Sequence, residues 1–224
     1  MLNVEGELRY RLLNILSRVG NEVSFEILGD MAQNENPDLR KAALKAIGNT
    51  QVSLSSNVTN SLKDQLNQAI NQKDSSLVLA LGQALTNGAS AETSAQLIAI
   101  TDNPAIDEPT NTALMQALEN AKSSKLVPYI NQYLANDPAL TTNAAITTGN
   151  VLANIQDISS ANAVIKWAEK ADFDKVGEQA KYWFNQLAQN SEIKSELRSV
   201  NQFHEFADPR MGDLIYQIGI NQSR

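Results

Sequence analysis

A stripe of five small or apolar residues, closed by an asparagine, recurs along this chain of 224 residues. In its clearest copy, within Asn36–Asn49, the stripe consists of Leu39, Ala42, Ala43, Ala46 and Ile47. Residues at these intervals share one face of an α-helix. Asn36 and Pro37 are typical of a helix start, and Gly48 followed by Asn49 is typical of a helix that ends in the left-handed conformation. The three alanines would let a neighbouring helix approach closely.

The same pattern recurs five more times, at intervals of 31 to 38 residues. Such recurrence is typical of helical repeat proteins. The first stripe residue and the closing asparagine of the later copies are Leu77 and Asn87, Thr110 and Asn120, Ala144 and Asn154, Ala180 and Asn190, and Met211 and Asn221. Proline or aspartate precedes several copies, as expected at helix starts: Pro37, Asp74, Pro109, Asp137, Pro138, Asp208 and Pro209. The helices that carry the stripe are named second helices below.

Apolar residues at helical spacing also predict a partner for each second helix. These first helices are expected at Val23–Gln33, Leu54–Asn71, Ala91–Thr101, Leu126–Ala135, Ala161–Ala171 and roughly Ser191–Phe206. A further helix at Glu7–Val19 has a predicted apolar face of Leu8, Leu12, Ile15, Leu16 and Val19. That helix reads either as the second helix of a hairpin whose first helix is missing, or as a terminal cap. No segment alternates like a β-strand, and no linker separates domains.

The segments Asn36-Pro37-Asp38, Arg40, Ala42-Ala43 and Ala46-Ile47-Gly48-Asn49 resemble the second helix of the HEAT repeat, in the form found in phycobilisome lyases and other bacterial proteins. The helical pairing also has a weaker similarity to the helical domain of vitellogenin-like lipid-transport proteins. None of the other copies has an arginine at the place of Arg40. The resemblance implies an all-α superhelix, a HEAT- or armadillo-like solenoid, with second helices lining its concave side. We therefore expect about six to seven stacked hairpins in one domain, residues 1–224, either complete or cut from a longer chain.

Composition narrows the classes of function. The net charge of −7, with Lys122 and Lys125 as the only basic residues between Asp74 and Ile165, argues against nucleic-acid binding. The absence of cysteine excludes disulfides and thiolate metal sites. No run of 18 apolar residues predicts a transmembrane helix, and no targeting signal is visible. The compartment therefore stays open, and the abundance of uncharged polar residues favours an exported context if the chain is a fragment.

Catalytic, metal and cofactor sites are not expected. His204 is the sole histidine, and with Glu205 and Asp208 nearby it reads better as a surface residue than as a ligand. Asp107-Glu108 reads as a helix start. Partner binding is instead predicted for polar residues of the second helices off the stripe, together with two aromatic residues: Arg40, Lys41, Lys45, Gln83, Gln116, Asn150, Lys181, Trp167 and Tyr182. The basic residues among these read better as a solvated helix face, and Trp183 and Phe184 read as core because they occupy stripe positions.

The first functional hypothesis is a non-enzymatic scaffold that binds a protein partner on the concave face of the solenoid. A helical domain of a larger exported or lipid-handling protein is one alternative, and a phycobilisome-type chromophore lyase is another. The lyase hypothesis rests on the resemblance alone, which is a weak basis for assigning chemistry.

Overall fold

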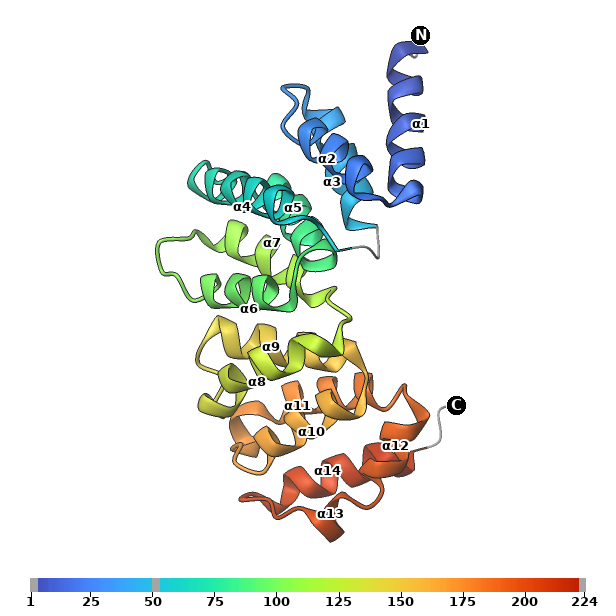
Figure 1. The fold of residues 1–224 in the computed structure, drawn as a ribbon. Helices are drawn as coiled ribbons and strands as arrows, with labels where there is room; N and C mark the ends of the chain where they lie inside the picture. The colour runs from blue at the N-terminus through green and yellow to red at the C-terminus, as the bar shows by residue number, and fades with distance from the viewer. Residues whose placement is uncertain (1–3, 50–52, 222–224) are drawn as a thin grey trace. The chain divides into compact units, whose positions relative to one another are not determined.

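The computed structural model is all-helical, as predicted, and contains no strand in the part of the chain that it describes (Figure 1). It describes residues 4–49 and 53–221, without the side chains of 4–6, 9 and 10. The helices are α1 (Val4–Val19), α2 (Glu22–Met31), α3 (Pro37–Gly48), α4 (Ser56–Asn71), α5 (Ser75–Gly88), α6 (Ala91–Ile100), α7 (Glu108–Glu119), the short 3₁₀ turn η1 (Ser124–Leu126), α8 (Val127–Asn136), α9 (Asn143–Ile155), α10 (Ile158–Ala168), α11 (Phe173–Leu187), α12 (Ser191–Leu197), α13 (Val200–Phe203) and α14 (Pro209–Ile220).

The predicted second helices correspond to α3, α5, α7, α9, α11 and α14, and the predicted first helices to α2, α4, α6, α8, α10 and α12. One first helix differs: the segment expected at Ser191–Phe206 is divided into α12 and α13. The helices group into two compact units, Met1–Leu97 with Asn103–Asn120 and Ile98–Asp102 with Ala121–Arg224. The superhelix and the single domain stay predictions, and each unit is described by itself.

In unit 1 the second helices pack directly on one another. α1 contacts α3, α3 contacts α5 and α5 contacts α7, while α2 and α4 lie against α3 and α5. Small residues permit this close packing, since a Cβ added to Gly82 would lie only 2.6 Å from the Cβ of Ala117. The close approach predicted from the small residues of the stripe is therefore present between α5 and α7.

Unit 2 has the same arrangement. α9 contacts α11 and α11 contacts α14, and the first helices α8, α10 and α12 contact one another in order. The Trp183 ring of α11 lies against the backbone of α9 at Gly149, where an added Cβ would fall 2.0 Å from a ring atom. Trp183 and Trp167 meet edge to face, with ring centroids 4.9 Å apart, and both are fully buried. The core of this unit therefore centres on aromatic residues between consecutive hairpins.

The stripe is confirmed as the buried face of the second helices. Most stripe residues are buried, and the half-buried exceptions are Ala42, Ala80, Ala188 and Leu214. The buried face is wider than predicted, because Leu44, outside the stripe, is also fully buried. A helix with a neighbour on each side in its row buries more than one stripe.

The predicted end signals are confirmed in position but not in conformation. Asn36 caps α3, its side chain accepting hydrogen bonds from the backbone of Asp38 and Leu39. The helix ends at Gly48, but Asn49 is right-handed, with φ of −88°. α9 also differs from expectation: Thr142 caps it, and Pro138 lies in the turn before it.

Two of the closing asparagines join consecutive second helices. The side-chain amide of Asn87, near the end of α5, donates to the carbonyl of Gly48 at the end of α3, at 2.9 Å. Asn190, after α11, donates in the same way to the carbonyl of Gln156, after α9, at 2.9 Å. The recurring asparagine therefore satisfies a carbonyl that the preceding helix leaves free at its end.

The predicted apolar face of α1 is present but is not buried, and its remaining residue, Leu16, is half-buried. Leu8, Leu12, Ile15 and Val19 are exposed, and Leu13 is the buried residue, at 2% exposure. α1 packs on α2 and α3, and this packing leaves its predicted apolar face uncovered. The hydrophobic pattern of a helix does not say which neighbours are present to cover it.

Candidate functional site

The polar sides of α3, α5 and α7 carry five of the residues predicted to bind a partner. Lys41, Lys45 and Gln116 are exposed, and Arg40 and Gln83 are half-buried. Lys45, Gln83 and Gln116 each stand six residues after the first stripe residue of their own helix. They are named the polar column below.

Contacts between the helices place the polar column in register. A Cβ on Gly48 would lie 3.6 Å from Ala84, and one on Gly82 would lie within 3.6 Å of both Leu114 and Ala117. Corresponding heights of α3, α5 and α7 therefore meet to within about one helical turn. The three residues of the polar column consequently lie at similar heights on three consecutive helices.

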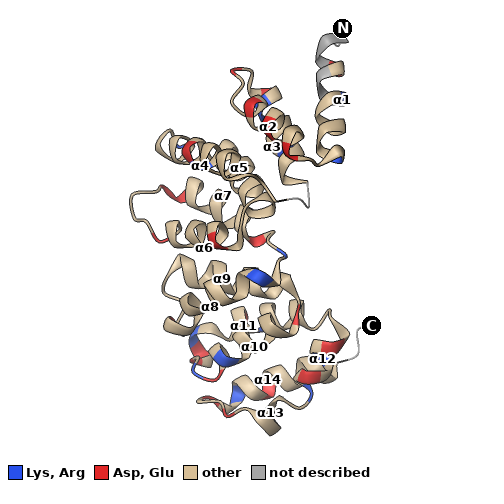
Figure 2. Cartoon of the chain, in the orientation of Figure 1, with Lys and Arg blue, Asp and Glu red and all other residues tan. Residues whose placement is uncertain are grey.

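The exposed lysines in and beside the polar column lie on α3. Lys41 and Lys45 are both exposed there, whereas α5 carries no charged residue (Figure 2). The Nε atom of Arg40 is buried without a hydrogen-bond partner among the described residues. The face therefore has lysines on α3 and uncharged amides on α5, while α7 carries Glu108 and Glu119 at its two ends.

In unit 2 the predicted residues divide by burial. Lys181 and Tyr182 are exposed on α11, and Tyr182 is 49% exposed. The side-chain oxygen of Asn150 accepts hydrogen bonds from the indole of Trp183 at 2.6 Å and from the amide of Gln179 at 3.2 Å. Asn150 therefore joins α9 to α11 and holds the tryptophan ring in place.

The prediction that Trp167 binds a partner is corrected by its burial. Its side chain is 2% exposed and packs against Trp183 in the core of unit 2. A residue with no exposed surface cannot anchor a partner unless the helices separate. Sequence alone did not separate this core tryptophan from the exposed Tyr182.

Sequence reasoning missed two residues at the register of the polar column. Gln186 of α11 and Gln217 of α14 also stand six residues after the first stripe residue of their helices. Gln217 is exposed, and Gln186 is half-buried and accepts a hydrogen bond from Gln189 at 3.0 Å. The signal that could have found them is the register itself, because every second helix carries lysine, glutamine or asparagine at this position.

His204 has a structural partner. Its Nδ1 lies 2.7 Å from the carboxylate of Glu169, and both side chains are partly exposed. The backbone N–H of Ala207 donates to the carbonyl of Glu169 at 2.9 Å, which fixes the turn before α14. Within residues 4–49 and 53–221, no group of three His, Cys, Asp or Glu side chains is placed to hold a metal ion.

Asp107, the other acidic candidate, is a helix cap. Its side chain accepts from the backbone of Thr110 at 3.0 Å and lies 3.9 Å from the ammonium of Lys73. Hydrogen bonds from Thr110 lower the pKa of Asp107 below its ordinary value. The prediction that Asp107-Glu108 marks a helix start is confirmed.

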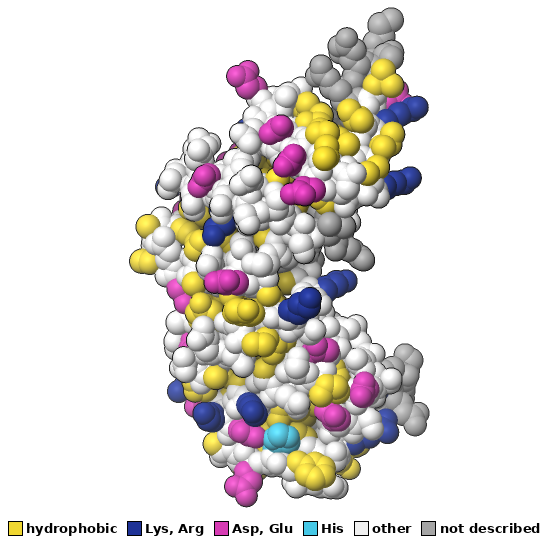
Figure 3. All heavy atoms as spheres, in the orientation of Figure 1, with side chains coloured by type: hydrophobic (Ala, Val, Ile, Leu, Met, Phe, Trp, Pro, Cys, Tyr) yellow, Lys and Arg dark blue, Asp and Glu magenta, His cyan; other side chains and the backbone are white. Residues whose placement is uncertain are grey.

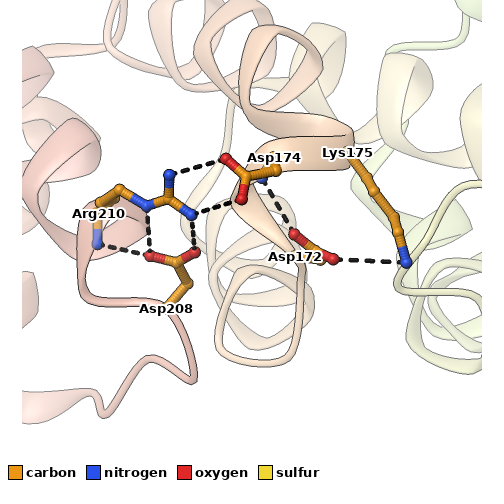
Figure 4. A network of polar contacts seen from close by, with 5 residues as sticks. All are labelled: Asp172, Asp174, Lys175, Asp208 and Arg210. Atoms are coloured by element: carbon orange, nitrogen blue, oxygen red, sulfur yellow. Dashed lines mark hydrogen bonds and ion pairs between the residues drawn. The ribbon is translucent and has the colours of Figure 1, made fainter.

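The densest polar network lies in unit 2, where α11 and α14 begin (Figure 4). The guanidinium of Arg210 contacts Asp174 at 2.7 and 3.0 Å, and Asp208 at 2.7 and 3.0 Å. It also lies 5.0 Å from the centre of the Phe173 ring. Asp208 caps α14, so the network joins the starts of two consecutive second helices. These hydrogen bonds raise the pKa of Arg210 and lower those of Asp174 and Asp208.

No helix among the described residues is both long enough and apolar enough to cross a bilayer.

The chain was compared with models of protein families, with curated proteins and with solved structures. None of the three comparisons finds a match.

Proposed function

We propose that this chain is a non-enzymatic, HEAT-like binding module that holds an extended, acidic polypeptide segment against the polar sides of α3, α5 and α7. The observation that carries the proposal is the polar column, in which Lys45, Gln83 and Gln116 share one sequence register and lie at similar heights on three consecutive helices. Packing does not require polar residues there, because the buried stripe of each helix faces elsewhere.

The chemistry of the polar column fits a polypeptide backbone. A glutamine side chain offers both an N–H donor and a carbonyl acceptor, the same pair that a peptide bond presents. An extended segment has these groups free along its length, so amides repeated along a row of helices bind it without demanding one side chain at each position.

The lysines would set the orientation in which a segment binds. Lys41 and Lys45 are exposed on α3, while α5 is uncharged. We therefore expect an acidic residue of the bound segment to lie over α3 and uncharged residues to lie over α5 and α7. Single exposed ion pairs add little affinity, about 0–1 kcal/mol each, so the lysines would set orientation more than strength.

Selection of peptides from a random display library on the full chain tests this function. Affinities of the selected peptides are then measured in solution by fluorescence anisotropy. The double variant Gln83→Ala/Gln116→Ala is expected to weaken binding about tenfold or more, because each lost hydrogen bond costs about 1 kcal/mol. Reversal of Lys41 and Lys45 to glutamate is expected to remove the preference for acidic peptides.

The matched control changes two exposed amides on a first helix, Asn67→Ala/Gln68→Ala on α4, and should leave the affinity unchanged. If the selected peptides bind the column variants as tightly as the parent chain, the second-helix face is not the binding site. No observation on the described residues favours the lyase or the lipid-handling alternative.

A further inference from the structure

An apolar patch is exposed on α1 and α2 of unit 1, apart from the polar column. Its six side chains are between 40% and 62% exposed: Leu8, Leu12, Ile15, Val19, Val23 and Ile27. Figure 3 shows hydrophobic side chains gathered over this part of the chain, with basic groups and an acidic group along the outer side of α1 and acidic groups over α2. It is named the N-terminal apolar patch below. A patch of this kind on a water-soluble surface marks an interaction site.

The spacing on α1 specifies the kind of contact. Leu8, Leu12, Ile15 and Val19 follow one another at intervals of four, three and four residues. This is the spacing of a seam that packs against another helix. Leu13 points to the opposite side and is buried, so the seam is not needed for the packing of α1 within its own unit.

The charges beside the patch have opposite signs on its two sides. Arg11 and Arg18 are exposed on α1, where Arg11 pairs with the exposed Glu7 at 2.6 Å, and Glu22 and Glu26 are exposed on α2. Consider a second copy related to the first by a twofold axis that lies in the plane of the patch and runs along the helices. This axis places α2 of the second copy opposite α1 of the first. Apolar residues then meet apolar residues, and each basic side meets an acidic side. A twofold axis that runs across the helices would instead place α1 opposite α1, so that the arginines of the two copies face each other.

We propose that the N-terminal apolar patch is a self-association surface, which joins two copies of this chain through α1 and α2 with the basic side of each patch facing the acidic side of the other. The self-complementary charge pattern selects a second copy as the occupant, because a surface of one sign would call for a different partner. The polar column lies on the polar sides of α3, α5 and α7, so the dimer and the peptide site are independent proposals.

Sedimentation velocity of the full chain over a concentration series tests the proposal. The parent chain is expected to form dimers that dissociate on dilution. Leu12→Glu places an unpaired charge in the interface and should weaken the dimer more than 100-fold. Phe203→Glu is the matched control, because Phe203 is 77% exposed on α13, outside the patch, and it should leave the dimer unchanged.

Charge exchange tests the orientation of the two copies. One variant carries Arg11→Glu/Arg18→Glu and the other carries Glu22→Arg/Glu26→Arg. Each should dimerise about tenfold more weakly by itself, because like charges then face each other. An equal mixture should recover dimers, since each basic side again meets an acidic side. Circular dichroism checks that every variant is folded.

Three results would overturn the proposal. The first is a parent chain that is monomeric at every concentration. The second is a dimer whose dissociation constant does not change with Leu12→Glu. The third is a mixture of the two charge variants that associates no better than either variant alone.

Discussion

The contact between Gly149 of α9 and Trp183 of α11 offers the sharpest test of how the second helices pack. A Cβ built on Gly149 would lie 2.0, 2.1 and 2.5 Å from three atoms of the indole ring. The ring has no free space to move into, because Trp183 is 0% exposed and its N–H donates to Asn150 at 2.6 Å. The substitution Gly149→Ala must therefore displace either the ring or the helix.

The expected cost follows from three contributions. Overpacking of a close-packed core costs about 1–3 kcal/mol. If the indole moves away from Asn150, the buried N–H of Trp183 loses its partner, at about 1–3 kcal/mol. Alanine stabilises a helix interior relative to glycine by about 0.5–1 kcal/mol. We therefore expect Gly149→Ala to lower the free energy of unfolding of unit 2 by about 3 kcal/mol, which is a large part of the stability of a typical domain.

Urea unfolding, followed by tryptophan fluorescence and circular dichroism, measures this change. Both tryptophans, Trp167 and Trp183, lie in unit 2, so fluorescence reports on that unit even if the two units unfold separately. Gly177→Ala is the matched control, because Gly177 is a half-buried helical glycine of the same unit whose added Cβ would approach the Phe173 ring only to 3.2 Å. Its effect should stay within about 1 kcal/mol.

A double-mutant cycle separates the clash from other effects. In a Trp183→Leu background the indole is absent, so adding Gly149→Ala should be neutral or stabilise by up to about 1 kcal/mol. The reasoning is refuted if Gly149→Ala costs less than about 1 kcal/mol, or if it costs the same with and without the tryptophan.

Three further predictions concern polar groups. Thr148→Val should raise the free energy of unfolding by about 1 kcal/mol in urea unfolding, because the hydroxyl of Thr148 is fully buried and has no hydrogen-bond partner among the residues that the structure describes; unchanged or lower stability would contradict this. Asn87→Ala should lower the free energy of unfolding by about 0.5–1 kcal/mol, because the hydrogen bond from Asn87 to the carbonyl of Gly48 is lost. Alanine at an exposed asparagine of α4 should leave the free energy of unfolding unchanged. Arg210→Gln should lower the thermal midpoint at neutral pH. Its partners Asp174 and Asp208 have pKa values below the ordinary 3.8, so the stabilisation is present above pH 3.8, and the difference between variant and parent should shrink as the pH falls below it; a difference that is constant with pH would contradict the ion-pair explanation.

The helix pairs could be predicted from sequence because the buried stripe is a property of each helix. Ala46, Ala84 and Ala117 hold the equivalent stripe position, and all are buried. Start signals were equally informative, since an asparagine or aspartate side chain needs only its own helix to form a cap. Asn36 and Asp107 both cap the helices that they were predicted to start.

Burial set by neighbouring elements could not be predicted in the same way. Leu12 and Leu13 are adjacent and chemically identical, yet Leu13 is buried and Leu12 is exposed, because only one side of α1 has neighbours to cover it. Trp167 of α10 is a similar case, because its burial depends on its contact with Trp183 of the next helix, α11.

The candidate site was predicted in part. Lys41, Lys45, Gln116, Lys181 and Tyr182 are exposed as a binding surface requires. For Asn150 the residue type allowed two roles, and its hydrogen bond to Trp183 shows that it supports the fold. An amide at one register of a helix predicts that a polar side faces outward, but it does not say whether a partner or a neighbouring side chain occupies that amide.

The central claim is that consecutive second helices pack directly on each other and leave their polar sides free. Because the chain has no cysteine, an introduced pair reports on one contact without interference. The pair Gly48→Cys/Ala84→Cys joins α3 to α5, where a Cβ added to Gly48 would lie 3.6 Å from the backbone N and Cα of Ala84. It should form a disulfide under mild oxidation. Lys41→Cys/Ala84→Cys, which starts from the exposed side of α3, should stay reduced. A cross-link in the second pair but not in the first would contradict the packing on which the binding face depends.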